Sequence, residues 1–260
     1  IIIILIIVLL IFLALYMYKL AHENNVKHDV IQFPNFPKSF SKLNIFFISD
    51  IHKRIITDDL ISNIPDTVDI VIIGGDLMEK GVPFSRVEGN VRKLKGIGPV
   101  YFVWGNNDYE VDYHYLDSLL LSLDVKILDN TAVVFESSEG EKISLLGVDN
   151  VSLLRDRLDL ALQDAANGSF KILAAHEPSI VKKFTSAENI SFVLSGHTHG
   201  GQIRIFNLGP FEKGKIKELD HTTLLNSNGY GTTTLPLRLG AKAETHFITL
   251  RSSDNNTLEL

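Results

Sequence analysis

The chain contains 260 residues, carries a formal net charge of −6 at pH 7 and has no cysteine. Without thiols it can form neither disulfides nor thiolate metal sites, so any bound metal must be held by nitrogen and oxygen atoms. The negative net charge, without a long basic run, argues against a protein that coats nucleic acid, and we expect no nucleic-acid partner.

Residues 1–18 are apolar without interruption and are followed by Lys19. A stretch of this length predicts a helix that spans a membrane. A cleaved signal peptide is the alternative, but cleavage after Ala21 would place Lys19 at position −3, where a small residue is needed. We therefore predict a single-pass anchor over residues 1–19 in the cell membrane. Sidedness stays open at this point, with an extracytoplasmic catalytic domain favoured.

Residues 20–42 mix Asn, Lys, His and Ser with two prolines and show no sustained periodicity, which predicts a linker. From Leu43 onward, short β-branched or aromatic runs alternate with helical stretches, as is typical of a layered α/β domain, here residues 43–260. We predict strands over residues 43–49, 69–73, 100–104, 142–146, 171–174, 191–194, 202–205 and 246–250. We predict helices over residues 57–64, 84–94, 113–122 and 154–166.

Several predicted strands are followed directly by a side chain that can bind a metal. In open α/β sheets, ligands bind at the carboxyl ends of the strands, so we expect these side chains to meet at one edge. The residues at these strand ends are Asp50, Asp76, Asn106, His176 and His197.

Taken one at a time, most of these motifs are ambiguous. Asp50-Ile-His52 places two ligand side chains two residues apart, but an aspartate at a strand end more often caps a turn. Asp76 follows two glycines and could bridge two cations through its two oxygens, or simply end a turn. Asn106 offers an amide oxygen within a sequence that also favours a turn, and an isolated His176 is more often a core or capping residue.

The segment Gly196-His-Thr-His-Gly-Gly201 is more specific. Two imidazoles flanked by three glycines, directly after an apolar strand, are poorly explained by core packing. His197 and His199 therefore predict metal binding. Together with the strand-end residues and His52 they form a series of candidate ligands that divides into two sets of four only if Asp76 is shared.

In this order, the motifs resemble those of the calcineurin-like metallophosphoesterase superfamily: Asp-x-His, Gly-Asp, Gly-Asn-His-Asp/Glu, His and Gly-His-x-His. The resemblance spans about residues 43–250. Residues 196–202 and the glycine-rich run at 228–240 are similar to small membrane-anchored bacterial members. The resemblance implies a four-layer α/β/β/α sandwich with metals at the carboxyl edge of its two packed sheets.

The resemblance also implies two divalent cations as cofactors. By position, Asp50, His52, Asp76 and His199 would hold one cation, and Asp76, Asn106, His176 and His197 the other. Two such cations share a water, lower its pKa and orient the resulting hydroxide for attack on phosphorus. The resemblance favours Mn²⁺, and Fe or Zn²⁺ also suits ligands of this kind.

Asn107 stands where the family has a catalytic histidine, and an amide does not titrate near neutral pH. Loss of a general acid costs about 10² to 10⁴ in rate when the leaving group is poor. We therefore expect a substrate with an acidic leaving group, such as a pyrophosphate, rather than a simple alkyl phosphomonoester. Asn107 is a candidate for catalysis and substrate binding. Asp108 beside it either supports catalysis or caps a turn.

A few residues outside the core motifs are further candidates. Lys53 and Arg54 follow the first motif and could contact substrate phosphate, although a solvated turn is the simpler interpretation. His114 and His221 could replace the missing acid. His114 lies in a predicted amphipathic helix and is better explained as a surface residue, and His221 lies in a polar stretch before the glycine-rich run.

The leading hypothesis is a membrane-tethered, dinuclear metal-dependent hydrolase of phosphoric esters or anhydrides. Its substrate would be a phosphorylated small molecule or a lipid-linked phosphate near the bilayer. A broad phosphodiesterase or phosphomonoesterase acting on soluble substrates is one alternative. A non-catalytic scaffold with the same fold is another, and the intact ligand series argues against it.

Overall fold

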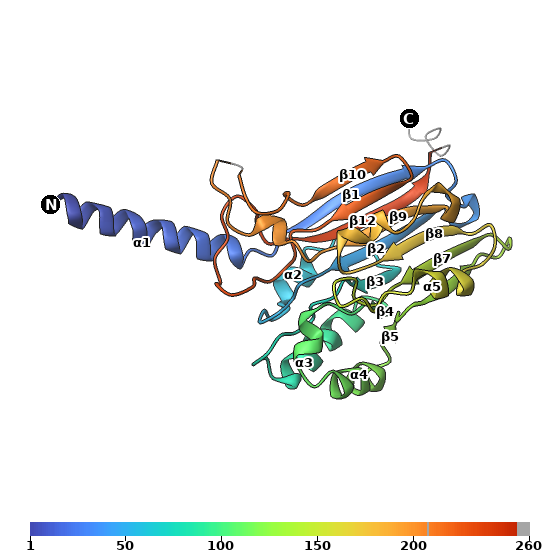
Figure 1. The fold of residues 1–260 in the computed structure, drawn as a ribbon, viewed down its shortest axis with the longest axis horizontal. Coiled ribbons are helices and arrows are strands. Elements are labelled where there is room, and N and C mark those ends of the chain that lie inside the picture. The colour runs from blue at the N-terminus through green and yellow to red at the C-terminus, as the bar shows by residue number, and fades with distance from the viewer. Residues whose placement is uncertain (207, 254–260) are drawn as a thin grey trace.

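The structure is a computed structural model that describes residues 1–206 and 208–253. Two six-stranded sheets pack face to face (Figure 1). The first has the order β1 (Val26–Phe33), β12 (Thr245–Ser252), β2 (Lys42–Ile48), β3 (Ile70–Ile73), β4 (Val100–Phe102) and β5 (Lys126–Ile127). The second has the order β10 (Lys215–Leu219), β11 (Thr222–Asn226), β9 (Ile190–Ser195), β8 (Phe170–Ala174), β7 (Lys142–Gly147) and β6 (Thr131–Glu136).

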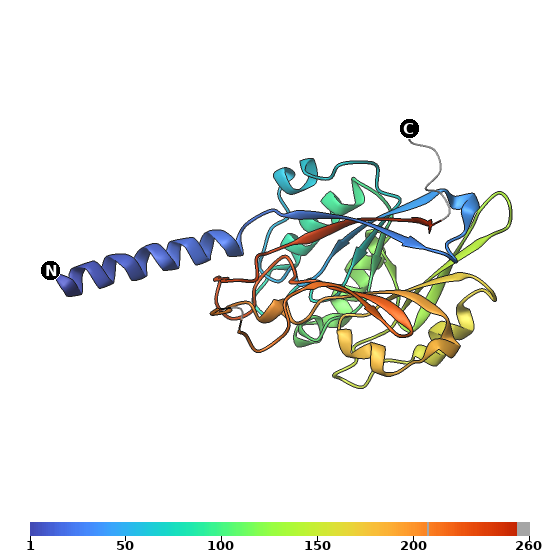
Figure 2. The ribbon, with the colours of Figure 1, turned by 90° about the horizontal axis from the view of Figure 1, so that it is seen from above.

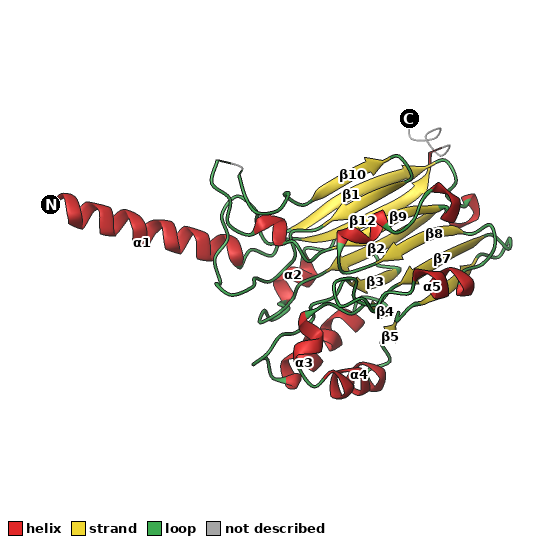
Figure 3. Ribbon diagram, viewed as in Figure 1, coloured by secondary structure: helices red, strands yellow, loops and turns green. Residues whose placement is uncertain are grey.

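Helices cover the outer face of each sheet (Figure 3). The α-helices α2 (Asp58–Ser62), α3 (Phe84–Lys95) and α4 (Tyr113–Ser122) lie outside the first sheet. The second sheet is covered by α5 (Leu158–Asp164) and the 3-10 helices η3 (Pro178–Lys182) and η4 (Ser186–Glu188). The remaining 3-10 helices are η1 (Lys38–Phe40), η2 (Asn107–Glu110) and η5 (His199–Gly201). This arrangement confirms the predicted α/β/β/α sandwich.

The core has three layers because the central strands are apolar on both faces. Phe47 and Ile72 of the first sheet pack in one cluster with Phe192 of the second, so this cluster lies between the sheets. Phe46, next to Phe47 in the sequence, faces the other way and belongs to the cluster that includes Leu94 of α3. Strands buried on both faces leave polar chemistry only at their ends, which is where the site forms.

The apolar N-terminal segment forms α1 (Ile2–Ala21), which projects from the sandwich with its first turns free of other elements (Figures 1 and 2). Among the described residues it is the one helix long and apolar enough to cross a membrane. Its last turns contact the domain. The Arg238 N–H donates to the Met17 carbonyl at 3.0 Å, and the Ala243 N–H donates to the Leu20 carbonyl at 3.3 Å.

The predicted linker over residues 20–42 is wrong for its middle part. Residues 26–33 form β1, which pairs in parallel with β12 in continuous register from Val26 opposite Thr245 to Phe33 opposite Ser252. The strand has a mixed polar pattern, and its stability depends on a partner more than 200 residues away, which a local pattern cannot reveal. Helix α1 therefore leads almost directly into the sheet.

The other predicted elements differ mainly at their ends. The predicted strand over residues 202–205 is wrong, because Ile203 and Ile205 form only isolated bridges after η5. The helix predicted over residues 154–166 is shorter, and β5, β6, β10 and β11 were not predicted. The remaining predicted strands and helices are present with ends shifted by at most two residues.

Candidate metal centre

The candidate ligands lie in loops that leave the carboxyl ends of β2, β3, β4, β8 and β9. These strands run in the same direction within each sheet, so their ends meet at one edge. Five of the seven candidate ligands adopt the left-handed backbone region, which is uncommon for residues other than glycine and concentrates at functional sites. The residues with positive φ are Asp50, His52, Asp76, His197 and His199.

Glycine is required where two of these loops approach a candidate ligand closely. A Cβ on Gly75, which has φ +84°, would lie 2.6 Å from Nδ1 of His176. A Cβ on Gly196 would lie 2.3 Å from Oδ2 of Asp50. Both distances are shorter than any contact a methyl group tolerates, so the glycines let the two sheets bring their side chains together.

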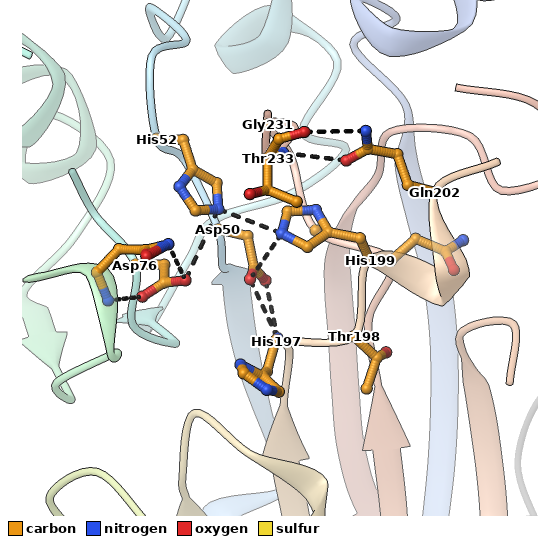
Figure 4. Close-up of polar contacts among 12 residues, drawn as sticks. Asp50, His52, Asp76, His197, Thr198, His199, Gln202, Gly231 and Thr233 are labelled. Carbon is orange, nitrogen blue, oxygen red and sulfur yellow. Dashed lines mark hydrogen bonds and ion pairs between the residues drawn. The ribbon is translucent and has the colours of Figure 1, made fainter. Parts of the chain in front are cut away.

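One half of the cluster contains Asp50, His52 and His199 (Figure 4). The Nε2 atoms of His52 and His199 lie 3.2 Å apart. His199 Nε2 lies 3.4 Å from Asp50 Oδ1, and His52 Nε2 lies 3.7 Å from Asp76 Oδ2. Three elements far apart in sequence thus direct nitrogen and oxygen atoms toward one point.

The other half is formed by Asp76, His176 and His197. His176 Nε2 lies 3.3 Å from Asp76 Oδ2 and 3.2 Å from His197 Nδ1. The amide oxygen Oδ1 of Asn106 is buried and has no hydrogen-bond partner among the described residues. Asp76 Oδ2 therefore faces imidazoles in both halves, which is the position expected for a bridging carboxylate.

The electrostatics of the cluster reflect this crowding of buried charges. Burial disfavours the charged form of His176, yet the carboxylates of Asp76 and Asp50 outweigh burial and raise its pKa to about 10. Burial and the nearby cations His52 and Arg238 lower the pKa of His199 to about 4, against the pull of Asp50. The imidazoles hold the pKa of Asp76 below its usual range despite burial. In the absence of metal ions, the negative charges of the carboxylates are therefore balanced by protons on the neighbouring imidazoles.

These residues fit divalent cations. Where two ring nitrogens face each other at 3.2 Å, only one of them can carry the intervening proton, so each such pair needs a proton or another cation between its nitrogens. A cation can replace the protons in both halves. The buried amide oxygen of Asn106, which has no hydrogen-bond partner among the described residues, adds an uncharged metal ligand. A mixed carboxylate, amide and imidazole set without thiolate suits Mn²⁺, Fe or Zn²⁺.

Three contacts orient the imidazoles from behind. His176 Nδ1 lies 2.8 Å from the Gly74 carbonyl, and His52 Nδ1 lies 2.9 Å from Oε2 of Glu79. The Arg238 guanidinium lies 3.2 Å from Nδ1 of His199. Such contacts orient the ring so that Nε2 points into the cluster.

Glu79 and Arg238 were not among the sequence candidates. The only signal for Glu79 is its position three residues after Asp76, and Arg238 lies in the glycine-rich run. Arg238 is fully buried. Its guanidinium donates to the carbonyl oxygens of His199, Asn228, Gly229, Gly231, Ala241 and Lys242.

Asn107 and Asp108 contact the scaffold of the site. The Asn107 backbone N–H donates to Asp76 Oδ1 at 2.8 Å, and its side-chain amide donates to Asp76 Oδ2 at 3.1 Å. Asp108 is fully buried and accepts from the N–H groups of Met78 and Gly105, and burial with the nearby Asp76 raises its pKa to about 7. Both carboxylate oxygens of Asp108 thus accept backbone N–H groups, and this geometry does not support direct catalysis.

Most of the residues predicted to contact the substrate outside the core motifs do not point into the cluster. Lys53 is exposed beside the site, where its ammonium pairs with Oε1 of Glu79 at 2.6 Å. The prediction for Arg54 is wrong, because its guanidinium donates to main-chain carbonyls of the α1–β1 junction and of Tyr230, and stacks on the Tyr230 ring. His221 lies at the far end of β11 and bonds the Val181 carbonyl, and His114 is exposed on α4.

Two cavities adjoin His197. One, of about 260 Å³, is also lined by His199, Gln202, Phe211 and Leu235. The other, of about 530 Å³, has polar lining residues that could contact a substrate phosphate or its substituent. They are Ser152, Glu177, Ser179 and Lys182. A phosphate placed at the cluster would therefore have room on two sides.

Comparison with known proteins agrees with this geometry. The model of the calcineurin-like phosphoesterase family matches residues 43–201. The chain is 45% identical over 243 residues to the uncharacterised protein YpbG of Bacillus subtilis, with 90% of each chain covered. It is 31% identical to a transmembrane protein with metallophosphoesterase domain of Danio rerio, over 84% of this chain and 55% of that protein.

The fold is also similar to that of the sulfate thiohydrolase SoxB from Thermus thermophilus, with a TM-score of 0.52 and 13% identity. That likeness covers 80% of this chain and 56% of SoxB, so the chain spans about half the length of this larger protein. The fold and the cluster define a metal-dependent phosphoesterase. The chain belongs to the calcineurin-like phosphoesterase family, and its enzyme class is that of the metallophosphoesterases.

Proposed function

We propose that the protein is a dinuclear metal-dependent hydrolase that cleaves phosphoric anhydrides or esters with acidic leaving groups, tethered to the membrane by α1. The observation that carries the dinuclear part is the position of Asp76 Oδ2, which lies 3.3 Å from His176 Nε2 and 3.7 Å from His52 Nε2. A single carboxylate oxygen facing imidazoles in both halves of the cluster supports two neighbouring cations.

The residues divide between the two halves. Asp50, His52, Asp76 and His199 would hold one cation, and Asp76, Asn106, His176 and His197 the other. Bound cations of this kind lower the pKa of a shared water and neutralise phosphate oxygens, and Mn²⁺ is our first candidate. The chain itself contributes orientation: Glu79, Arg238 and the Gly74 carbonyl keep the rings directed inward.

The leaving-group preference rests on Asn107. Its side-chain amide carries no dissociable proton near neutral pH, and it donates to Asp76. The neighbouring acid Asp108 has its carboxylate turned to backbone N–H groups of Met78 and Gly105, away from the cavities beside His197. Because neither Asn107 nor Asp108 can protonate the leaving group, we favour substrates whose leaving group departs as a stable anion, such as the phosphate released from a pyrophosphate.

The membrane tether rests on α1, whose 20 residues are long enough to span the hydrocarbon core, and on the transmembrane name of the Danio rerio relative. The tether holds the site close to the lipid head groups. A lipid-linked phosphate is therefore our preferred substrate class, and we favour an extracytoplasmic position for the domain.

A metal-reconstituted screen of the full chain tests this proposal. Nucleotide diphosphate sugars, lipid pyrophosphates, phosphodiesters and phosphomonoesters are compared, each with the wild type, Asp76→Asn and the surface control Asp124→Asn. We expect faster hydrolysis of anhydrides than of monoesters and two bound metals per chain. Asp76→Asn alone should lose both the hydrolytic activity and the metals. Activity on soluble esters only would favour the broad phosphodiesterase, and bound metals without any hydrolysis would favour the scaffold.

A further inference from the structure

An apolar hairpin lies beside the candidate metal centre. The N–H of Ile205 donates to the Leu208 carbonyl at 3.0 Å, and the N–H of Leu208 donates back to the Ile205 carbonyl at 2.9 Å. At this tip Ile205 is 61% exposed, Phe206 94% and Leu208 78%. Leu235, in the neighbouring loop, is 53% exposed. We call these four residues the apolar rim. Adjacent large apolar side chains in water mark a contact surface.

A chain of main-chain hydrogen bonds connects the rim to α1. The Arg204 N–H donates to the Leu239 carbonyl at 2.7 Å, and the Leu239 N–H donates to the Gln202 carbonyl at 2.9 Å. Next to Leu239, the Arg238 N–H donates to the Met17 carbonyl of α1 at 3.0 Å. The Gln202 side chain also bonds the carbonyls of Thr233 and Leu235. The loops that carry the rim are therefore attached to the anchor and to one another.

The attachment point lies at the depth where a membrane helix meets the head groups. Met17 stands between Tyr16 and Tyr18, both about half exposed, and Lys19 follows. Tyrosines and a terminal lysine are typical of this interfacial level. Figures 1 and 2 show the loops after β9 and β11 beside the last turns of α1, at the end of the sandwich from which the helix projects.

We propose that the apolar rim inserts into the bilayer surface and docks the mouth of the metal centre on the membrane. The proposal rests on the membrane tether proposed above. It commits to a lipid bilayer as the occupant because the loops that carry the rim are hydrogen-bonded, through Arg238, to the apolar helix at the interfacial residue Met17.

The position of the rim also indicates the class of substrate. Leu235 belongs both to the rim and to the lining of the cavity of about 260 Å³ that reaches His197 and His199. Ile203, Pro210 and Phe211 line the same cavity, so apolar side chains share its lining with the imidazoles of His197 and His199. Such a cavity suits a phosphate or pyrophosphate head group whose lipid chain remains in the bilayer.

Because the chain has no cysteine, single labelling sites can be introduced cleanly. Phe206→Cys, Leu10→Cys and Leu121→Cys are made in the full chain, labelled with a nitroxide and reconstituted into phosphatidylcholine–phosphatidylglycerol vesicles. Leu10 reports on the anchor, and Leu121 is a 59% exposed apolar control on α4. Collision of each label with oxygen and with a water-soluble nickel chelate measures lipid contact.

We expect oxygen collisions to predominate at positions 206 and 10, and nickel collisions at position 121. A label at 206 that is as accessible to nickel as the label at 121 overturns the proposal, and so does spin–spin broadening at 206, which would identify a second copy as the occupant. A water-exposed label at position 10 would instead refute the tether itself.

A kinetic comparison separates docking from catalysis. Phe206→Ser with Leu208→Ser, and Leu121→Ser as control, are assayed on a lipid pyrophosphate in vesicles and on soluble bis(p-nitrophenyl) phosphate. We expect the rim variant to lose about tenfold or more on the vesicle substrate and to keep its soluble activity. Equal activity of rim and control variants on vesicles would overturn the proposal. An inactive wild type on all substrates would refute the proposed hydrolase while leaving the labelling result valid.

Discussion

Asn107 holds the carboxylate of Asp76 at both ends, through its backbone N–H to Oδ1 at 2.8 Å and its side-chain amide to Oδ2 at 3.1 Å. Asp76 Oδ2 is also the atom that faces His176 and His52. The residue that departs from the family pattern thus orients the carboxylate shared by both halves of the cluster. A neutral amide can do this at any pH, whereas it cannot deliver a proton to a leaving group.

Changing Asn107→His should therefore help poor leaving groups most. We expect the rate for alkyl phosphomonoesters to rise relative to that for aryl esters and pyrophosphates, because the imidazole restores a general acid. A series of esters with leaving groups of graded pKa measures the slope in wild type and variant. Asn107→Ala is the matched control, since it removes the side-chain contact with Asp76, keeps the backbone contact and adds no acid. A wild-type rate that is independent of leaving-group pKa would contradict this explanation.

Metal binding should release protons. The pKa of His176 is raised to about 10, so at pH 7 this ring is protonated in the metal-free protein and must lose its proton to become a ligand. Metal affinity should accordingly increase with pH, by about tenfold per pH unit for each proton displaced. Calorimetry in buffers of different ionisation enthalpy measures the number released. Asp76→Asn removes the charge that retains the His176 proton, so the pKa of His176 in the metal-free variant, followed by NMR titration, should fall. An unchanged pKa of His176 in this variant would argue against the assignment.

Arg238 should be a positioning residue for His199 as well as a structural one. In Arg238→Lys the charge remains, but the fork that reaches several buried carbonyls is lost, and we expect unfolding free energy to fall by about 3 kcal/mol. Metal affinity should weaken by about 10- to 100-fold through His199. Denaturant unfolding and metal titration of folded protein separate the two effects. Arg157→Lys, at an exposed ion pair, is the control. If folded Arg238→Lys binds metal as tightly as the wild type, Arg238 does not position His199 and has only a structural role.

Glu244 should make the attachment of β1 dependent on pH. It is buried, accepts from the Asn228 N–H at 2.8 Å and pairs with Lys27 of β1 at 2.6 Å. Burial raises its pKa, but His246 and Lys27 outweigh burial and hold the pKa at about 2. A depressed folded pKa stabilises the protein above the unfolded pKa of 4.5, and this contribution disappears as pH falls towards 2.

In Glu244→Gln we therefore expect a loss on the order of 3 kcal/mol at pH 5.5 that shrinks progressively below pH 4.5. Denaturant unfolding of wild type and variant at pH 5.5 and pH 3, both with chelator, measures the difference without a contribution from metal loss. The exposed Asp124→Asn serves as control. A destabilisation of equal size at both pH values would show that Glu244 acts through packing and not through its charge.

Much of the site can be predicted from the sequence because its ligands lie in short motifs at the ends of predicted strands. Five of the seven candidate ligands stand at the ends of predicted strands, and parallel strands necessarily bring their carboxyl ends to one edge. The paired histidines of residues 197–199 among glycines indicated metal chemistry before any contact was known. The order of the motifs then identified the family, and with it the layers of the sandwich.

Other features depend on contacts between segments that are distant in the chain. β1 is stable because β12 supplies its hydrogen bonds, so residues 26–33 alone resembled a linker. Arg54 follows a ligand motif, yet its guanidinium contacts the α1–β1 junction and Tyr230 instead of the site. Arg238 approaches His199 only because the glycine-rich run folds back over it.

The apolar pattern and the type and order of polar residues therefore defined the fold class, the candidate ligands and the apolar N-terminal helix, since these depend on periodicity and composition. Which side chains orient the ligands, what Asn107 contacts and where the apolar rim faces depend on main-chain hydrogen bonds between loops and on the direction in which α1 leaves the domain. Those interactions form between residues brought together only by folding, and the chemistry of either partner alone does not specify them.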